Sequence, residues 1–325
     1  MQLGIFAKTF PGTDPATVLG AVAGAGYAVA QYNMACSGME PLPAAIPPEA
    51  SAAIRAGAEA SGVGIVAVSG TFNMIHPDKD VRAEGLRRLG GLIAAAPAMG
   101  TRLVTLCTGS RDPADMWRAH PDNATPAAWA EMTASMAVAV EAAEAAGVDL
   151  GIEPELANVV SSAEAARRLI DEMRSPRLRI VLDAANLFEA ATLETQRDIV
   201  SRAVELLADR IAMAHAKDRD AAGGFVAAGQ GVLDNRHYLG ALRRAGFDGP
   251  LVTHGLSAAE APGGAAFLRR ELETLTRARD GSSGMAAPSA TSRTGRGPTS
   301  SSSTGSAATR ARSRRSTRPS RRRTG

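Results

Sequence analysis

The chain has 325 residues and a formal charge of +3, but residues 281–325 hold ten of its arginines and no acidic residue, so the first 280 residues carry −7. No run approaches the roughly 20 apolar residues that a membrane span needs, and the N-terminus lacks the charged leader and apolar stretch of a secretory signal. The two cysteines make neither a disulfide framework nor a zinc knuckle. We therefore expect a cytoplasmic protein without membrane spans.

Short apolar runs alternate with longer Ala-rich amphipathic segments along residues 1–278. The runs typical of buried strands are Leu3–Lys8, Tyr27–Tyr32, Gly64–Ser69, Leu103–Cys107, Asp149–Glu153, Arg179–Asp183, Ile211–His215 and Leu251–His254. The helical patterns between them cover residues 14–24, 48–61, 79–97, 126–146, 161–173, 194–208, 235–245 and 258–278. Helix boundaries are marked by Asp14 and Thr125, each followed by proline, and by Gly26, Gly62 and Gly147 after helices.

Eight strand–helix units favour a closed (β/α)₈ TIM barrel, which typically takes about 250 residues. An open doubly wound sheet is the alternative, but it needs a Gly-x-Gly-x-x-Gly turn after an early strand. The nearest candidate, Gly20 to Gly26, lies inside and at the end of a helical pattern instead. We predict one barrel domain over residues 1–280.

Residues 281–325 differ in composition from the rest of the chain. They contain twelve Ser and no Val, Leu, Ile, Phe, Tyr or Trp. Such a segment cannot bury enough apolar surface to offset the entropy lost on folding, so we predict a disordered Ser/Arg-rich tail. Whether this tail is an inert extension or an appendage attracted to RNA or membranes is left open.

Four consecutive predicted strands end in residues able to bind a divalent cation. Glu153 ends the fifth strand, Asp183 the sixth, His215 the seventh and His254 the eighth. In a TIM barrel the carboxyl ends of the strands meet at the catalytic face. Any one of these residues alone could be a helix cap, but crowded carboxylates repel each other without a cation. The set predicts a site for Mn²⁺, Mg²⁺, Co²⁺ or Zn²⁺.

The segments around these strand ends resemble the sugar phosphate isomerase/epimerase superfamily with the xylose isomerase-like barrel. That superfamily includes ketose 3-epimerases, hydroxypyruvate isomerase, inosose dehydratase and endonuclease IV. The likeness is carried by Gly151-Ile152-Glu153-Pro154, Val181-Leu182-Asp183-Ala184-Ala185-Asn186, His215-Ala216-Lys217-Asp218 and Gly229-Gln230-Gly231-Val232-Leu233-Asp234. The resemblance implies that Glu153, Asp183 and His215 bind the metal and that Glu153 is an acid/base.

The chain departs from the superfamily pattern at two positions. Asn186 stands where many members have a histidine, and His254 stands where they have a glutamate that is both a ligand and the second base. An imidazole can still bind a metal, so the predicted ligand set is retained. The two-carboxylate proton shuttle of the ketose 3-epimerases is called into question.

From these residues we expect a metal-dependent isomerase or epimerase of a sugar, sugar phosphate or related hydroxy-ketone. A metal that chelates the carbonyl and a neighbouring hydroxyl acidifies the C–H between them and stabilises the enediolate. A base then removes the proton, and the same or another group returns it. Glu153 is the candidate for one role, and His254 or Lys217 for the other.

Further candidates for substrate binding lie in loops. After the third strand, Asn73 and His76 could reach a sugar hydroxyl, although a lone loop histidine is as often structural. In the long loop after the fourth strand, Arg111 could pair with a phosphate or carboxylate, or the loop could be a surface excursion held down by Trp117. Asn186 completes the predicted substrate-binding set.

Two other functions compete with this one. The departures at Asn186 and His254 would suit a non-catalytic barrel that binds a sugar or a metal. A repair nuclease like endonuclease IV needs three zinc ions, whereas the chain has five histidines in all and its first 280 residues lack a basic surface for phosphates. We expect a small sugar as partner and no nucleic acid on the barrel, and leave homo-oligomerisation open.

Overall fold

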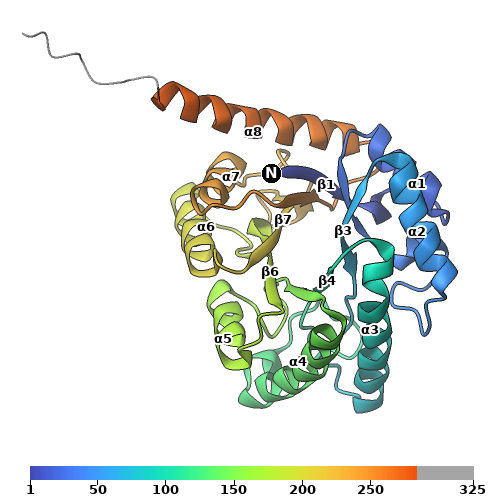
Figure 1. Ribbon diagram of the computed structural model, residues 1–325. Coiled ribbons are helices and arrows are strands. Elements are labelled where there is room, and N and C mark those ends of the chain that lie inside the picture. Colours follow the sequence, from blue (N-terminus) through green and yellow to red (C-terminus); the bar gives the residue numbers. More distant parts are fainter. Residues whose placement is uncertain (284–325) are drawn as a thin grey trace, which may run out of the picture. The chain divides into compact units, whose positions relative to one another are not determined.

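The eight apolar runs form a closed parallel barrel in the computed structural model, which describes residues 1–283 (Figure 1). The barrel strands are β1 (Gln2–Phe6), β2 (Val29–Tyr32), β3 (Gly64–Ser69), β4 (Leu103–Leu106), β5 (Asp149–Ile152), β6 (Leu178–Asp183), β7 (Ile211–Ala216) and β10 (Pro250–Thr253). Strand β10 pairs with β1 and closes the ring. The predicted TIM barrel is confirmed.

Helices surround these strands, as Figure 1 shows. The α-helices are α1 (Pro15–Gly24), α2 (Pro48–Ser61), α3 (Lys79–Met99), α4 (Pro126–Ala146), α5 (Ala163–Met173), α6 (Leu193–Leu207), α7 (Asn235–Arg244) and α8 (Ala261–Ser283). Short 3₁₀ helices are η1 (Ala7–Thr9), η2 (Met34–Ser37), η3 (Pro121–Ala124) and η4 (Ala184–Asn186). The apolar faces of the α-helices pack on the outside of the strands and make the main core.

The predicted boundary signals act as caps. Asp14 accepts the N–H of Thr17 at 2.8 Å, and Thr125 accepts the N–H of Ala128 at 3.2 Å. Each cap precedes a proline at the first helical position, where the missing N–H costs nothing. Gly147 ends α4 with a φ of 64°, a left-handed conformation that glycine adopts without strain.

Two features differ from the sequence-based prediction. A two-stranded hairpin, β8 (Asp218–Arg219) with β9 (Phe225–Val226), rises from the loop after β7 and had no clear signal because each strand has only two residues. Helix α8 runs to Ser283, past the predicted domain limit at 280. The rest of the predicted tail lies outside the described residues. None of the described helices is long and apolar enough to span a membrane.

Candidate active site

The alternation of side chains along four strands places the predicted metal ligands at the mouth of the barrel. A small core inside the barrel consists of Ala67, Leu103, Val181, Met213 and Val252. Asp183, His215 and His254 each follow one of these inward residues by two positions, and residues two apart on a strand share a face. Glu153 likewise follows Gly151, where a Cβ would lie 2.8 Å from Val181. The barrel core therefore directs all four ligands inward.

These four side chains meet as the sequence predicts. One ligand atom from each of Glu153, Asp183, His215 and His254 lies within 4.8 Å of all the others. Nδ1 of His215 is 3.2 Å from Oε1 of Glu153, and Nε2 of His254 is 3.1 Å from Oδ2 of Asp183. The two imidazole rings are 4.5 Å apart. His254 thus points toward the carboxylates.

A cavity of about 620 Å³ opens over these residues. Glu153, His215 and His254 line it together with Lys217. Its other polar lining residues are Lys8, Gln31, Asn33, Ser69, Thr71, Thr105 and Glu155. The cavity is within the size range of ordinary ligand pockets, and its polar groups suit a hydroxyl-rich molecule.

Opposite charges outweigh burial at both carboxylates of the cluster. Burial alone would raise the pKa of Asp183, but the ammonium of Lys217 and the hydrogen bond from His254 hold that pKa well below its usual range. Burial likewise opposes ionisation of Glu153, and its contact with His215 lowers its pKa. Burial and the neighbouring His215 lower the pKa of His254, so its imidazole is neutral near pH 7. Both carboxylates are therefore ionised.

Lys217 and Glu155 add charge to the wall of the cavity. Nζ of Lys217 lies 3.3 Å from Oδ2 of Asp183. Burial opposes its charge, yet Asp183, Glu153 and Glu155 together raise its pKa, so Lys217 is a cation. Burial raises the pKa of Glu155 to about 7. Glu155 was not identified from the sequence, although it lies three residues beyond the end of β5.

The donor set suits a divalent metal ion. It offers two ionised carboxylates and a neutral imidazole at His254 with a second imidazole at His215, all at the carboxyl ends of β5, β6, β7 and β10. Oxygen and imidazole donors in this ratio fit Mn²⁺, Co²⁺ and Zn²⁺, and Mg²⁺ through the carboxylates. A cation would also compensate the two buried negative charges.

Gln31 orients His215 and was missed in the sequence. Its Oε1 lies 2.8 Å from Nε2 of His215, and its own amide donates to Oγ1 of Thr105 at 3.0 Å. Because the amide of Gln31 is committed to Thr105, its oxygen must accept a hydrogen from Nε2. Nδ1 of His215 is then the ring nitrogen that faces Glu153, at 3.2 Å from its Oε1. Gln31 could have been identified from the sequence because it is a polar residue inside the apolar run Val29–Tyr32.

Replacing Gln31 by leucine should weaken metal binding about 10- to 100-fold, as is typical when the partner of a metal-binding histidine is lost. The test is calorimetric titration of the metal-free protein with Co²⁺, together with the visible absorption of bound Co²⁺. Gln196→Leu is the matched control, because Gln196 is a buried amide on α6 away from the cavity. Equal Co²⁺ affinity in the Gln31 variant and the wild type would contradict this role.

Asn186 is a hydrogen-bond donor to the carboxylate of Glu153. Its Nδ2 donates to Oε1 of Glu153 at 2.8 Å, and the side chain is buried and does not line the cavity. Its Oδ1 has no hydrogen-bond partner within the described residues. The structure thus gives Asn186 a positioning contact, and its predicted contact with substrate stays a prediction.

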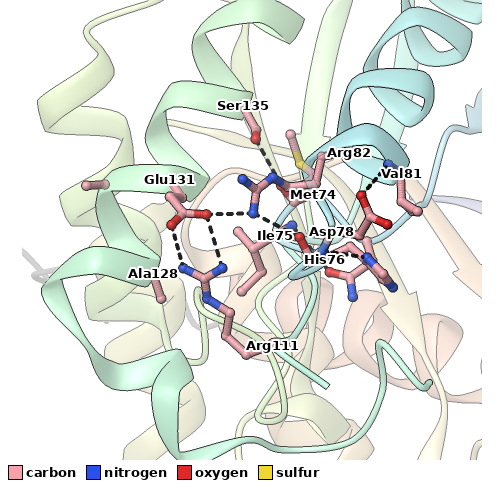
Figure 2. Close-up of polar contacts among 12 residues, drawn as sticks. Met74, Ile75, His76, Asp78, Val81, Arg82, Arg111, Ala128, Glu131 and Ser135 are labelled. Atoms are coloured by element: carbon pink, nitrogen blue, oxygen red, sulfur yellow. Dashed lines mark hydrogen bonds and ion pairs between the residues drawn. The ribbon is translucent and has the colours of Figure 1, made fainter. Parts of the chain in front are cut away.

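The three substrate-binding candidates from the loops make contacts within the protein, and Figure 2 shows two of them, His76 and Arg111. Arg111 and Arg82 both direct their guanidinium groups at Glu131, at 2.9 and 2.6 Å. Nε2 of His76 lies 3.0 Å from the carbonyl of Pro113. None of the three candidates lines the 620 Å³ cavity.

Asn73, the third candidate, bridges the loops after β3 and β4. Its Nδ2 donates to the carbonyl of Ser110 at 2.8 Å, and its Oδ1 accepts the N–H of Ser110 at 3.1 Å. Its polar atoms, like those of His76 and Arg111, are thus engaged within the protein. Substrate contacts for these residues stay predictions that the geometry does not support.

Asp218, in the segment that follows β7, stabilises the conformation of the loop up to Asn235 through its hydrogen bonds. Its buried carboxylate accepts the N–H groups of Arg219, Gly229 and Leu233 and the side-chain amide of Asn235, all at 2.9 to 3.0 Å. A Cβ at Gly231 would lie 2.1 Å from the carbonyl oxygen of Arg219, so the turn needs glycine there. The Asp218 and Gly-Gln-Gly segments are thus one structural unit.

Within the described residues the other three histidines lie apart from the cluster. His76 contacts Pro113, His120 caps η3, and His237 lies 2.8 Å from the hydroxyl of Ser201. The described part of the chain therefore does not assemble the larger histidine set that a three-zinc nuclease site requires.

Comparison with known proteins agrees with this architecture. The sequence profile of the xylose isomerase-like TIM barrel family matches residues 19–275, and the chain belongs to that family. No curated protein matches the sequence.

Solved structures with the same fold include several sugar epimerases. An L-ribulose 3-epimerase superposes with a TM-score of 0.70 at 20% identity, over 88% of this chain and 99% of that one. The apo 3-keto-D-glucoside 4-epimerase of E. coli gives 0.64 at 17% identity, over 85% and 99%. The D-psicose 3-epimerase of Clostridium cellulolyticum H10 gives 0.64 at 17% identity, over 84% and 99%. At these identities the likeness establishes the fold.

Proposed function

We propose that the protein is a metal-dependent isomerase or epimerase of a sugar or a related hydroxy-ketone. The observation that carries this proposal is the convergence of Glu153, Asp183, His215 and His254 within 4.8 Å, beside a cavity that Glu153, His215 and His254 line. The sugar epimerases among its structural neighbours support the same class of reaction. The four residues would hold one divalent cation.

A bound cation would act as a Lewis acid on the carbonyl and hydroxyl of the substrate and so acidify the carbon between them. Glu153 lines the cavity as an ionised carboxylate and takes the proton from that carbon. Asn186 and His215 hold Oε1 of Glu153, which fixes the direction of its carboxylate.

Lys217 supplies the second proton-transfer group. Its ammonium lines the same cavity and is held 3.3 Å from Asp183, and a lysine ammonium is a hydrogen donor. Nε2 of His254 faces Asp183, which suits a ligand better than a base that must face the substrate. We therefore assign His254 to the metal and Lys217 to the returning proton.

The test is deuterium incorporation from D₂O into a panel of ketoses, followed by NMR. We expect incorporation at the carbon next to the carbonyl with protein that contains Mn²⁺ or Co²⁺. Removal of the metal by chelation should abolish it, and addition of the metal should restore it. Stoichiometric metal without exchange in any ketose would instead support a non-catalytic binding barrel.

The assignment of Lys217 has its own readout. Lys217→Met should slow product formation more strongly than deuterium exchange. Glu153 can still remove the proton from the substrate, exchange it with D₂O and return deuterium to the same carbon. Lys79→Met is the control, since Lys79 starts α3 and does not line the cavity. Equal loss of exchange and product formation would argue against Lys217 as the group that returns the proton.

A further inference from the structure

The short turn that follows β6 connects two of the four clustered residues. Helix η4 begins directly after Asp183, and Oδ1 of Asp183 accepts the N–H of Ala185 at 2.9 Å. Asn186, the last residue of η4, donates from Nδ2 to Oε1 of Glu153 at 2.8 Å. A movement of this turn would therefore shift the carboxylates of both Asp183 and Glu153.

Two buried side chains from the segments after β7 bond the backbone of this turn. On one side of Asp183, the hydroxyl of Tyr238 on α7 donates to the carbonyl of Leu182 at 2.7 Å. On the other side, Nε of Arg219 on β8 donates to the carbonyl of Ala185. The backbone is thus held both before and after Asp183.

The start of α7 fixes the position of the Tyr238 side chain. Asp234 caps the helix by accepting the N–H of His237 at 2.9 Å, and the amide of Asn235 donates to the buried carboxylate of Asp218 at 2.9 Å. Tyr238 lies on this first turn and is only 1% exposed. Water therefore cannot take the place of its hydroxyl.

The hydroxyl of Tyr238 is a donor that acts only through the backbone. Burial raises the pKa of Tyr238 well above its usual value, and the negative charges of Asp183 and Glu153 raise it further. The hydroxyl therefore keeps its proton at neutral pH and donates it to the carbonyl. Tyr238 does not line the 620 Å³ cavity, so its contact with Leu182 is its link to the cluster.

Arg219 is a buried cation that bonds carbonyls and no carboxylate. Among the described side chains, no carboxylate oxygen lies within 4.0 Å of its guanidinium. The guanidinium donates to the carbonyls of Ala185 and Gly223, and its carbon lies 4.1 Å from the ring centre of Phe225. A buried charge is costly unless hydrogen bonds satisfy it, and here the turn and the β8–β9 hairpin supply them. Arg219 thus ties the hairpin to η4.

We propose that Tyr238 and Arg219 are positioning residues that set the geometry of the metal donors through the backbone of residues 182–186. Their two bonds hold Asp183 between them, and they act on Glu153 through the end of η4. This inference rests on the metal site of the proposed function, because donor geometry matters only if the four residues hold a cation.

The first test is calorimetric titration of metal-free Tyr238→Phe with Co²⁺, since this substitution removes one hydroxyl and keeps the ring. Loss of a direct partner of a metal ligand typically costs about 10- to 100-fold in affinity. Tyr238 acts one step further away, so we expect binding about three- to tenfold weaker, with a changed visible absorption spectrum of the bound Co²⁺. Arg219→Lys keeps the charge but loses the forked guanidinium, and it should weaken binding by a similar factor.

The chain offers a matched control for each variant. The buried hydroxyl of Tyr27 also donates to a backbone carbonyl, that of Ala261, at 2.8 Å and away from the cavity, so Tyr27→Phe removes an equivalent bond. Arg55 donates to two carbonyls at the end of α3, so Arg55→Lys is the control for the arginine. Both tyrosine variants should lower the urea midpoint similarly, but only Tyr238→Phe and Arg219→Lys should alter Co²⁺ binding.

Wild-type affinity and an unchanged Co²⁺ spectrum in Tyr238→Phe would overturn the inference and leave the metal site intact. An equal loss of affinity in Tyr27→Phe would also overturn it, because a general loss of stability would then explain both results. If Tyr238→Phe does not fold, Arg219→Lys decides by the same measurement.

The proposed function fails by different results. A wild-type protein that binds no Co²⁺ would overturn the metal site, and this inference with it. Weaker Co²⁺ binding in both variants, without deuterium exchange in any ketose, would retain the positioning role and reject the isomerase or epimerase reaction.

Discussion

Asp183→Asn is expected to abolish metal binding and to lower deuterium exchange about a thousandfold or more. The asparagine oxygen can still accept the N–H of Ala185 at the start of η4, so the fold should persist. Its amide nitrogen, however, would replace the oxygen on which His254 and Lys217 converge. Losing Lewis-acid stabilisation of several kcal/mol accounts for the rate, since about 1.36 kcal/mol is tenfold.

The matched control for this variant is Asp209→Asn, because the Asp209 carboxylate is largely exposed and pairs with Arg167 on the surface. It should leave Co²⁺ binding and exchange unchanged. Both variants are compared by metal content, Co²⁺ absorption and exchange rate. An Asp183 variant with wild-type Co²⁺ affinity would show that the four-donor site is wrong.

Asp218→Ala is expected to lower the free energy of unfolding by about 3–5 kcal/mol. The substitution leaves three backbone N–H groups and the amide of Asn235 without their acceptor, and each unsatisfied buried donor costs about 1–3 kcal/mol. Partial relaxation of the loop keeps the total below the simple sum. Urea unfolding followed by circular dichroism measures the change.

Asp220→Ala is the control on the same loop. Asp220 accepts the N–H groups of Ala222 and Gly224 in an exposed turn, where water can replace it. Its removal should cost about 1 kcal/mol or less. If both variants lost the same stability, Asp218 would not organise the loop from the interior.

The four clustered residues could be predicted as candidate metal ligands because their signal is local. Each of Glu153, Asp183, His215 and His254 closes an apolar run, and the barrel brings all strand ends to one face. The repeated alternation of strands and helices predicts the barrel fold without information about tertiary contacts. The hairpin Asp218–Val226 was not predicted, because strands of two residues are too short to show a periodic pattern.

The roles of the loop residues could not be predicted because they depend on partners far away in the sequence. Gln31 and His215 are 184 residues apart, yet they share a hydrogen bond. Arg111 looked free to bind an anion, but α4 brings Glu131 to it. The residue type determines which partners a side chain can contact. Only the fold determines which partners within the protein it does contact.

The charge balance of the chain also illustrates the difference between what the sequence determines and what the tertiary structure determines. The sequence alone separated an acidic barrel segment from an arginine-rich tail, and it predicted the alternation of strands and helices and the four residues that meet at the strand ends, because composition and periodicity are properties of contiguous residues. Only the tertiary structure decided which polar residues face the cavity, which hold the loops, and that Trp117 and Phe225 line the same cavity. Those properties depend on packing between segments that the sequence keeps apart.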